Sequence, residues 1–348
     1  MRRIRIRPRN GLWQASVSAK DRRYGEIGVG DRVSAAACSP AEMKTALILG
    51  RSNGVGLDRD ASLLAATLAE SGVVTKNPRI KSFRALLSKE FRADGAFHLE
   101  RVAPLWKRKA GTHFLIPNQE RFPRRLLGRL GMIDHVLCKS RHAVEAFSKH
   151  HSSVHFIGFT SEDRRDEVVV PDYSRFFHLA GRSTLKNTGL LLDLWGKHPE
   201  WPRLTLVQHP DNAPQSVSPN VELISRYLDD AELRGLQNAC GIHLCPSLSE
   251  GWGHYIAEAM SCAAVTLTTD APPMNELVTA ERGVLVPSLR SEPRHLGMNF
   301  HADPEALESA IQRLIVMPDE QKRELGLAGR QWFEENVRSF AGRIAHFL

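Results

Sequence analysis

The stretch that decides the fold is PSLSEGWGHYIAEAMSCAAVTLTTDAPPMNE, which runs from Pro246 to Glu276. The apolar run GIHLCPS that leads into it predicts a buried strand, and AVTLTTD within it predicts a second strand because β-branched residues favour extended backbone. The glycines of Gly-Trp-Gly permit positive φ and a close backbone approach. A helix is predicted to begin near His254. The segment is therefore predicted to form a strand, a glycine turn, a helix and a strand, which is half of a nucleotide-binding α/β unit.

The same segment carries groups that suit an anion and a sugar. A helix that begins near His254 directs free N–H groups and the positive end of its dipole toward the glycine turn, which favours an anion there. Two glutamates, Glu250 and Glu258, stand on either side of that turn. Glu258 lies one helical turn beyond the helix start, where its carboxylate can accept hydrogen bonds from the vicinal hydroxyls of a sugar.

Taken together, this pattern resembles the donor site of retaining GT-B glycosyltransferases, and more narrowly that of the group 1, family 4 class. The matching features are Glu before Gly-aromatic-Gly, then Glu-Ala-Met, a strand of small residues and a closing Pro-x-Asn-Glu. The motif fixes many positions at once and is more specific than a short Gly-x-Gly. The resemblance implies that Glu250 contacts the transferred hexose and that Glu258 bonds to the nucleotide ribose. It also places Gly251, Trp252 and Gly253 at the donor.

A second match lies upstream, in RFFHLAGRSTLKNTGLLLDLW (Arg175–Trp195). The pattern predicts a strand ending at Gly181, a loop with Arg182 and Lys186, and an amphipathic helix. Two cations on one loop can flank a diphosphate, Arg as a planar fork and Lys as a point charge, although a solvated loop with two surface cations is the alternative. In the family this Arg and Lys hold the donor pyrophosphate as a leaving group. The resemblance therefore makes Arg182 and Lys186, with Glu250, the candidate catalytic residues.

The chain has 348 residues, which suits two domains of ordinary size. Short apolar strands alternate with helical segments, a pattern typical of doubly wound parallel sheets. We therefore predict an α/β protein with two Rossmann-like doubly wound parallel-sheet domains facing a cleft, the GT-B plan. The expected ranges are 43–165 for an acceptor domain, 175–330 for a nucleotide-sugar donor domain and 331–348 for a helix that, by resemblance, crosses back to the first domain.

Most of the net charge of +8 lies in residues 1–42, which hold nine Lys and Arg against four Asp and Glu. The segment lacks strong helical or strand periodicity. Three interpretations stay open: a disordered tail, a non-native extension from an upstream start, and a basic arm for nucleic acid or acidic lipid. The first two are favoured because arginine-rich runs are usually solvated, so no nucleic-acid partner is expected.

The acceptor domain is predicted to open with a strand at TALILGR. A loop with Gly54 and Gly56 follows, and then a helix capped by Asp58 or Asp60. In the family this glycine loop faces the cleft and contacts acceptor or donor phosphate.

The loop after the fourth predicted strand reads IPNQERF. In the family this loop contacts the donor hexose, often through a histidine. Here Asn118 and Glu120 occupy the candidate position. The departure from histidine leaves the identity of the sugar open, and a plain structural turn explains Asn118 equally well.

A helix with proline at its start is predicted at PRRLLGRLGMI. Its Arg124, Arg125 and Arg129 raise the alternative of a peripheral membrane contact. The helix is short and its leucines can face the core, so that contact is not favoured. In the donor domain, the loop after VELISRY meets the nucleobase by resemblance, which makes Ser225, Arg226 and Tyr227 candidates.

The five cysteines lack Cys-x-x-Cys spacing, which favours buried free thiols in a reducing cytoplasm over disulfides or a metal site. No apolar stretch approaches the roughly twenty residues that span a membrane, and no secretory signal is present. We therefore expect a cytoplasmic protein. Because Arg182 and Lys186 can neutralise a diphosphate, we expect neither a metal nor a cofactor, the nucleotide sugar being a substrate.

The sequence thus predicts an enzyme of the hexosyltransferase class. Its donor would be a nucleoside-diphosphate sugar and its acceptor a carbohydrate, a lipid-linked or another small molecule; retention of configuration is implied by the family alone. Paired cations and the exposed amides of residues 251–253 would stabilise the charge of the leaving diphosphate. A nucleotide-sugar epimerase or phosphorylase on the same fold is the alternative. A non-catalytic or nucleic-acid-associated protein is a third interpretation, suggested only by the basic segment.

Overall fold

A computed structural model of the chain describes residues 44–51 and 56–348. The predicted segment 1–42 and Gly54 lie outside the described residues. In the described part, six strands form a first sheet in the order β2-β1-β3-β4-β5-β6, with every neighbouring pair parallel. These strands are β1 (Thr45–Leu49), β2 (Val74–Lys76), β3 (Ala93–Leu99), β4 (Ala110–Ile116), β5 (His135–Cys138) and β6 (Val154–Phe156).

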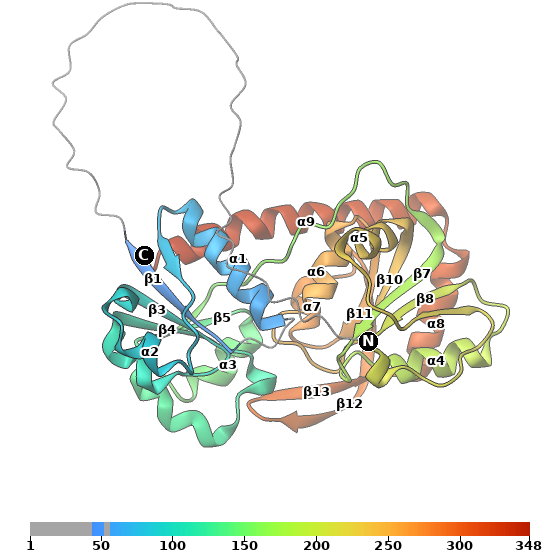
Figure 1. Cartoon of the computed structure of the whole chain (residues 1–348). Coiled ribbons are helices and arrows are strands. Elements are labelled where there is room, and N and C mark those ends of the chain that lie inside the picture. Colours follow the sequence, from blue (N-terminus) through green and yellow to red (C-terminus); the bar gives the residue numbers. More distant parts are fainter. Residues whose placement is uncertain (1–43, 52–55) are drawn as a thin grey trace, which may run out of the picture. The chain divides into compact units, whose positions relative to one another are not determined.

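Helices and short 3₁₀ segments connect these strands (Figure 1). The helices are α1 (Gly56–Glu70), α2 (Phe83–Leu87) and α3 (Arg141–Ser148), and the 3₁₀ segments are η1 (Lys89–Phe91), η2 (Pro104–Lys109), η3 (Gln119–Arg121) and η4 (Arg124–Met132).

The side chains of β1 explain why both faces of this sheet are covered. Successive side chains of a strand point to opposite faces. Leu47 and Leu49 pack with Trp106 of η2 on one face. Ala46 and Ile48 belong to the cluster that includes the apolar side of α1 on the other face. A strand buried on both faces contains a continuous apolar run, as TALIL does.

Seven strands form the second sheet, in the order β13-β12-β11-β10-β7-β8-β9. Every pair is parallel except β12 and β13, which are antiparallel. The strands are β7 (Asp172–Gly181), β8 (Leu204–Gln208), β9 (Val221–Ile224), β10 (Cys240–Cys245), β11 (Val265–Asp270), β12 (Val284–Arg294) and β13 (Gly297–Ala302). Two sheets of this kind confirm the predicted fold class, while the predicted domain boundaries stay predictions.

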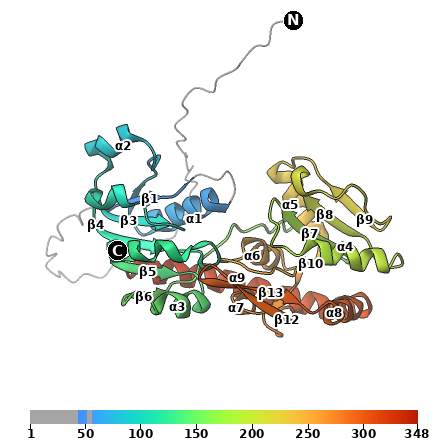
Figure 2. The same cartoon turned by 90° about the horizontal axis from the view of Figure 1, so that it is seen from below.

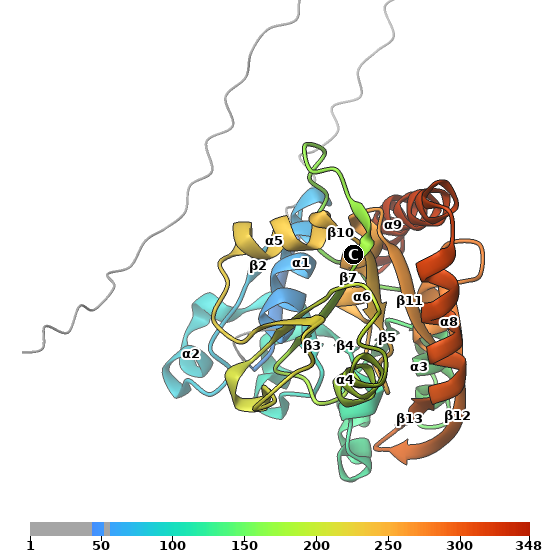
Figure 3. The same ribbon diagram turned by 90° about the vertical axis from the view of Figure 1, so that its right-hand side faces the viewer.

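Helices cover both faces of the second sheet as well. They are α4 (Thr188–Lys197), α5 (Asp230–Ala239), α6 (His254–Ser261), α7 (Met274–Leu277), α8 (Pro304–Val316) and α9 (Asp319–Ala345), with the 3₁₀ segment η5 (Pro210–Asn212) after β8. Trp195 of α4 and Ile311 of α8 share one apolar cluster with Phe176. Leu236 of α5 shares another with Phe177. Figure 3 shows α5 and α8 on opposite sides of this sheet.

The long helix α9, red in Figures 1 and 2, reaches from one sheet to the other. Near its start, Lys322 Nζ donates to the carbonyl oxygen of Tyr173 in β7, at 3.2 Å. Just beyond its end, the Phe347 ring lies 6.2 Å from the Phe114 ring of β4. The helix therefore packs against both halves of the chain.

Three details differ from the sequence-based expectations. The β12–β13 hairpin was not predicted. Its Pro287 stands opposite the last residue of β11 and its Pro293 lies beyond that strand, where β12 has a neighbour on one side only, so both prolines are tolerated. Residues Arg124–Met132 form 3₁₀ turns rather than the predicted helix, in a segment whose two glycines weaken a helix. The predicted caps Asp58 and Asp60 are wrong, since α1 begins at Gly56 and both lie inside it.

Among the described residues, four cysteines are free and buried, as predicted: Cys138, Cys240, Cys245 and Cys262. Cys38 lies outside the described residues. No helix in the described part of the chain is long and apolar enough to cross a membrane.

The order of the strands fixes where a ligand can bind. In parallel α/β sheets, ligands bind beyond the carboxyl ends of the strands, where successive connections turn to opposite sides. In the first sheet this switch point lies between β1 and β3. In the second sheet it lies between β7 and β10. The two sequence motifs directly follow β7 and β10.

The packing of α9 gives a first prediction. A Cβ at Gly326 would stand 2.0 Å from the carbonyl oxygen of Ala263, so Gly326→Ala is expected to destabilise the protein by about 1–3 kcal/mol through overpacking. Gly342 lies in the same helix with nothing near its Cβ position. There the matched change Gly342→Ala is expected to add up to about 1 kcal/mol, because alanine favours helix. Urea denaturation of both variants measures the difference, and equal midpoints would contradict the packing of α9 on the loop before β11.

Candidate functional site

A cavity of about 590 Å³ lies at the switch point of the second sheet, lined by residues of both halves of the chain. Ten of the predicted site residues line it: Gly56, Asn118, Glu120, Arg182, Lys186, Glu250, Gly251, Trp252, Gly253 and Glu258. We call this cavity the cleft. The two sequence motifs, which are some seventy residues apart in the chain, therefore meet in space.

The ion pair of Lys186 and Glu250 forms one wall of the cleft. Lys186 Nζ lies 3.1 Å from Glu250 Oε1 and 2.9 Å from the centre of the Tyr255 ring. Ser247 Oγ donates to the same carboxylate oxygen at 2.6 Å. Both charged side chains are largely buried. The ammonium and the carboxylate are thus held together at the lining of the cleft.

The turn at 251–253 brings backbone unusually close to the opposite wall. A Cβ at Gly251 would stand 2.4 Å from Asn118 Oδ1, so a larger residue there would force the Asn118 side chain to move. Gly253 has a φ of 103° and precedes the first residue of α6, a backbone conformation that glycine adopts without strain. The first amides of a helix have no acceptor within it. The amides of α6 therefore begin at the cleft, as the sequence predicted.

Arg182 lines the cleft, but its guanidinium is turned toward the loop after β8. Its Nη2 lies 2.6 Å from His209 Nε2 and 3.6 Å from the carboxylate of Asp211. The side chain is largely exposed. It follows the same strand as Lys186, so both cations project from one loop at the carboxyl end of β7.

Glu258 is buried in α6 and already has partners. Arg59 of α1 forms an ion pair with its Oε1, and Gln237 Nε2 donates to Oε2 at 3.3 Å. The carboxylate therefore joins the two halves of the chain. A ribose could use Oε1 only by sharing it with Arg59 or displacing it, which the sequence did not predict.

The residues predicted to meet the nucleobase lie apart from the cleft lining. Ser225, Arg226 and Tyr227 follow β9, at the far edge of the second sheet. Arg226 pairs with Glu232 on the surface at 2.8 Å, and the Tyr227 side chain is exposed. The cleft lining at this end instead includes Leu233 of α5.

The loop after β4 forms the opposite wall and holds buried acceptor atoms that lack a donor. Within the described part of the chain, Asn118 Oδ1, Gln119 Oε1 and Glu120 Oε2 have no hydrogen-bond partner. Gln119 Nε2 donates to the backbone oxygen of Glu250 at 2.8 Å, which holds this loop against the donor-motif turn. Buried polar atoms nearly always have partners, and Asn118 and Glu120 line the cleft, so their acceptor atoms can take hydrogen bonds from water or from a ligand there.

Burial raises the pKa of Glu120 to about 7. Its own backbone amide and the charge of Arg121 lower the pKa, while the charge of Glu250 raises it, and burial prevails. Glu120 therefore changes protonation near neutral pH, inside the cleft.

A buried polar network that the sequence did not predict connects the two walls. Asp60 of α1 accepts from Lys139 Nζ at 2.6 Å and from His254 Nε2 at 2.8 Å. Ser161 Oγ lies 2.8 Å from His254 Nδ1 and accepts from the Trp252 indole at 3.2 Å. Burial alone would raise the pKa of Asp60, but the charge of Lys139 and the bond from His254 outweigh it and hold that pKa well below its usual range.

No sequence signal links the members of this network. Asp60, Lys139, Ser161 and His254 come from four separate segments, and only folding brings them together. Asp60 also belongs to the triplet Asp58-Arg59-Asp60, an Asp-x-Asp arrangement, but its carboxylate is committed to Lys139 and His254. In residues 44–51 and 56–348, no group of three or more His, Cys, Asp or Glu side chains is arranged to hold a metal ion.

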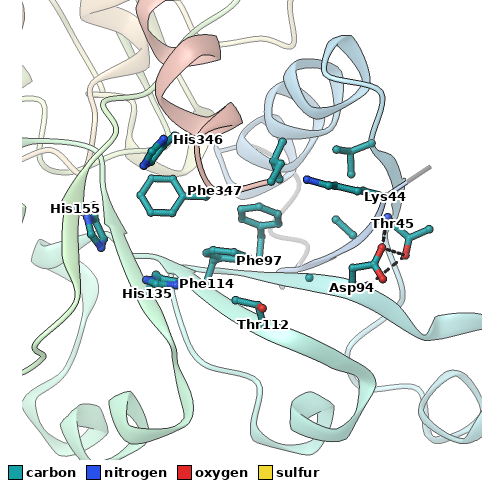
Figure 4. A pocket seen from close by; sticks show the side chains of 14 residues that line it. Lys44, Thr45, Asp94, Phe97, Thr112, Phe114, His135, His155, His346 and Phe347 are labelled. Atoms are coloured by element: carbon teal, nitrogen blue, oxygen red, sulfur yellow. Dashed lines mark hydrogen bonds between the residues drawn. The ribbon is translucent and has the colours of Figure 1, made fainter. Parts of the chain in front are cut away.

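A second cavity, of about 550 Å³, lies at the amino ends of the strands of the first sheet (Figure 4). Phe347, beyond the end of α9, extends over it, with ring centres 5.8 Å from His135 and 5.0 Å from His155. Within its lining, the backbone amide of Thr45 donates to the carboxylate of Asp94 at 2.8 Å. Ligands of parallel sheets bind at the carboxyl ends of the strands. This cavity lies at the opposite ends.

Comparison with known proteins agrees with this geometry. Residues 175–316 match the family model described as glycosyl transferases group 1. The matched segment is less than half of the chain. It contains both sequence motifs and the Lys186–Glu250 pair. Alpha-maltose-1-phosphate synthase of Mycolicibacterium smegmatis is 32% identical over 113 residues, which cover 31% of this chain and 26% of that protein. The match thus spans about a quarter of the length of that relative.

Solved structures similar to this chain cover nearly all of the described residues. Sucrose-phosphate synthase of Thermosynechococcus elongatus superposes with a TM-score of 0.65 at 16% identity, over 88% of this chain and 98% of that one. HepE of Anabaena, in complex with UDP and glucose, gives 0.68 at 14% identity, over 87% and 99%. A glycosyltransferase of Rickettsia africae gives 0.64 at 13% identity, over 88% and 98%. At these identities the likeness shows the fold, which is GT-B.

The cleft wall opposite the Lys186–Glu250 pair contains Glu120, whose raised pKa gives a second prediction. The native state holds this proton more tightly than the unfolded state does. Stability contributed by the protonated form is therefore complete below pH 4.5 and is lost as the pH rises from 4.5 through about 7. We expect the unfolding free energy of the wild type to fall by up to about 3 kcal/mol more than that of Glu120→Gln over this range.

Urea denaturation at pH 4.5, 6 and 8 measures this difference. The matched control is Glu70→Gln, which removes an exposed carboxyl at the end of α1. Parallel pH profiles for the wild type and Glu120→Gln would contradict the buried state of this carboxyl.

Proposed function

We propose that the cleft transfers a hexosyl group from a nucleoside-diphosphate sugar to a hydroxyl-bearing acceptor. The observation that carries the proposal is that hydrogen-bond donors and cations line one side of the cavity and hydrogen-bond acceptors line the other. Lys186, Arg182 and the start of α6 offer positive charge and N–H groups on one side. Asn118 and Glu120 offer buried acceptor oxygens without partners on the other. A ligand with an anionic end and a hydroxyl-rich end satisfies both.

The cationic side would bind and stabilise the leaving diphosphate. When the bond between C1 of the sugar and the diphosphate oxygen breaks, its electron pair stays on that oxygen, and negative charge grows there. Lys186 Nζ and the amides at the start of α6 are fixed before the reaction, so they stabilise this charge with little reorganisation. Arg182 would leave His209 and add a forked pair of donors. The acceptor hydroxyl oxygen forms the new bond to C1 and releases its proton.

The acceptor-rich side would bind the sugar. Sugar hydroxyls donate hydrogen bonds, and Asn118 Oδ1, Glu120 Oε2 and the carboxylate of Glu250 accept them. Glu250 would also orient C1, because Lys186 and Ser247 hold its carboxylate in place. Satisfying the buried acceptors removes a cost of about 1–3 kcal/mol for each atom, which favours a sugar over an apolar ligand.

The nucleoside would lie beside Glu258. We propose that its carboxylate binds the ribose hydroxyls once Arg59 shares or releases Oε1. The Anabaena relative with the same fold has structures with UDP and with UDP-glucose, which supports a uridine nucleotide as the first donor to try. The group 1 domain supports retention of configuration, and the paired cations support transfer without a metal. A cytoplasmic location fits the free cysteines.

One observation favours a second candidate. The Glu120 carboxyl changes protonation near neutral pH, as an acid or base catalyst in a nucleotide-sugar epimerase does. An epimerase would convert the nucleotide sugar without any acceptor, whereas a transferase releases the nucleoside diphosphate at a rate that depends on the acceptor. Incubation with UDP- and GDP-sugars, with and without acceptors, separates the two activities. The absence of thermal stabilisation by every nucleoside diphosphate tested would refute both.

The cation that matters most gives a third prediction. Lys186→Met is expected to weaken UDP binding roughly tenfold or more, because a charge-assisted hydrogen bond contributes about 1.5–3 kcal/mol. Lys197→Met, at the other end of α4, is the matched control, since Lys197 pairs with Glu308 on the surface. Isothermal titration with UDP measures both, and comparable affinities for the two variants would contradict the placement of the diphosphate.

Glu258 and Arg182 give a fourth prediction. Glu258→Ala is expected to weaken donor binding, seen as a higher KM for the nucleotide sugar, whereas Arg182→Ala chiefly lowers kcat. Arg59→Ala is the control for Glu258, because it breaks the same ion pair but keeps the carboxylate, whose Oε1 then loses its cationic partner. If Arg59→Ala raises KM as much as Glu258→Ala does, Glu258 acts only by holding Arg59. Wild-type kinetics for both Glu258→Ala and Arg182→Ala would refute both assignments.

A further inference from the structure

A separate cavity lies at the switch point of the first sheet, directly beside the cleft. It has a volume of about 440 Å³ and is bounded by the segments after β1 and β3 and by η4. Leu57 and Glu100 line both this cavity and the cleft, so the two are neighbours with a shared wall. The carboxyl ends of β1 and β3 are where this fold places a ligand. We call this cavity the first-sheet pocket.

The charges that line the first-sheet pocket are almost all positive. Its basic side chains are Arg51, Lys81, Arg101, Arg125 and Arg129, and its carboxylate is Glu100. They come from four separate segments of the chain. Glu100 is paired with Arg101, at 3.1 Å. Among residues 44–51 and 56–348, no ion pair is found for Arg51, Lys81, Arg125 or Arg129. Four uncompensated cations therefore surround one concave site.

The local backbone shows that Glu100 is held in a costly conformation at this position. Glu100 has a φ of 63°, and the amide of Arg101 donates to the carbonyl of Leu99 at 2.7 Å, which closes a tight γ-turn. Such a turn is strained for a residue with a side chain. Strained residues collect at ligand sites, because the surrounding structure must hold them there. Here the turn directs the chain so that Arg101 lines the pocket.

Arginine side chains favour one class of anion in such a pocket. A guanidinium offers parallel N–H donors that match the oxygens of a phosphate, and several of them around one concavity bind a group with more than one negative charge. The diphosphate of a donor would be held by Lys186 and Arg182, which follow β7 in the second sheet. The first-sheet pocket therefore offers a second anion site, for a different molecule.

We propose that the first-sheet pocket binds the phosphate group of the acceptor. This inference rests on the proposed function, since it names the class of acceptor: a phosphorylated molecule with a free hydroxyl that reaches past Leu57 and Glu100 into the cleft. Two sources share this chemistry, a soluble sugar phosphate and a lipid-linked phosphate. The apolar lining, which includes Leu105 and Leu126, accepts the carbon skeleton of either one.

The experiment is a titration of the full-length protein, saturated with UDP, against inorganic phosphate, glucose 6-phosphate and glucose. Saturation with UDP keeps the probes out of the diphosphate site. We expect glucose 6-phosphate and phosphate to bind measurably more tightly than glucose. We expect the double variant, Arg125→Ala with Arg129→Ala, to weaken phosphate binding at least tenfold. Added salt is expected to weaken phosphate binding as well, because salt screens exposed charges.

Arg124→Ala is the matched control. Arg124 lies on the same 3₁₀ segment and is exposed, but it does not line the pocket. All three arginines are on the surface, so the variants are expected to fold, and an unchanged thermal midpoint checks this. If Arg124→Ala weakens phosphate binding as much as the double variant does, or if neither weakens it, the pocket is not the phosphate site and the inference is wrong.

Two further arms identify the source and separate this inference from the proposed function. The first arm measures binding to vesicles that contain phosphatidic acid. If the protein binds these vesicles more tightly than glucose 6-phosphate, with the same dependence on Arg125 and Arg129, the acceptor is lipid-linked. If vesicle binding depends equally on Arg124, the protein makes a flat membrane contact and the inference about the pocket is wrong. UDP binding without phosphate binding refutes the inference alone. Phosphate binding that depends on Arg125 and Arg129, in a protein that binds no nucleoside diphosphate, refutes the proposed function alone.

Discussion

The buried ion pair of Asp60 and Lys139, extended by His254, is the contact on which the cleft depends. Asp60 belongs to α1 beside the first sheet, and His254 is the first residue of α6 beside the second. Removing one partner of such a pair leaves an uncompensated buried charge, which costs about 3–5 kcal/mol. The network therefore fixes where α6 begins relative to α1. It is the start of α6 that carries the amides and the glycine turn of the cleft.

In both sheets, the same geometric rule decides which segments carry the charged residues of a cavity. Each has parallel strands around one switch point, and the segments beyond the strands at that point are free to carry ligand-binding residues. In the second sheet these segments hold Lys186 and Glu250. In the first sheet they line a pocket rich in arginine. A side chain at Gly251 would meet Asn118. Glycine at this position therefore lets the second-sheet segments approach the first half of the chain closely. One cavity is thus lined by residues of both halves of the chain.

The electrostatics of the cleft follow from how closely each carboxylate is paired with a cation, since Arg121 lies 3.6 Å from Glu120, farther than the cations beside the other three. Glu250, Glu258 and Asp60 each have a cationic partner, Lys186, Arg59 and Lys139 respectively. Glu120 is fully buried against the charge of Glu250, and burial raises its pKa to about 7. Three carboxylates therefore act as fixed parts of the framework. Glu120 is instead a carboxyl of this wall whose protonation changes near neutral pH.

The sequence by itself determined the local elements and the two motifs. The alternation of apolar strands and helical segments predicted the two parallel sheets, and the pattern around Glu250 and the pair Arg182 and Lys186 predicted which loops form the cleft. These features depend on neighbours in the chain. The tertiary structure alone decided the rest: that Arg59 pairs with Glu258, that Asp60 joins Lys139 and His254, and that five basic residues from four segments surround one pocket. Such contacts join residues far apart in sequence, and no periodicity or spacing encodes them.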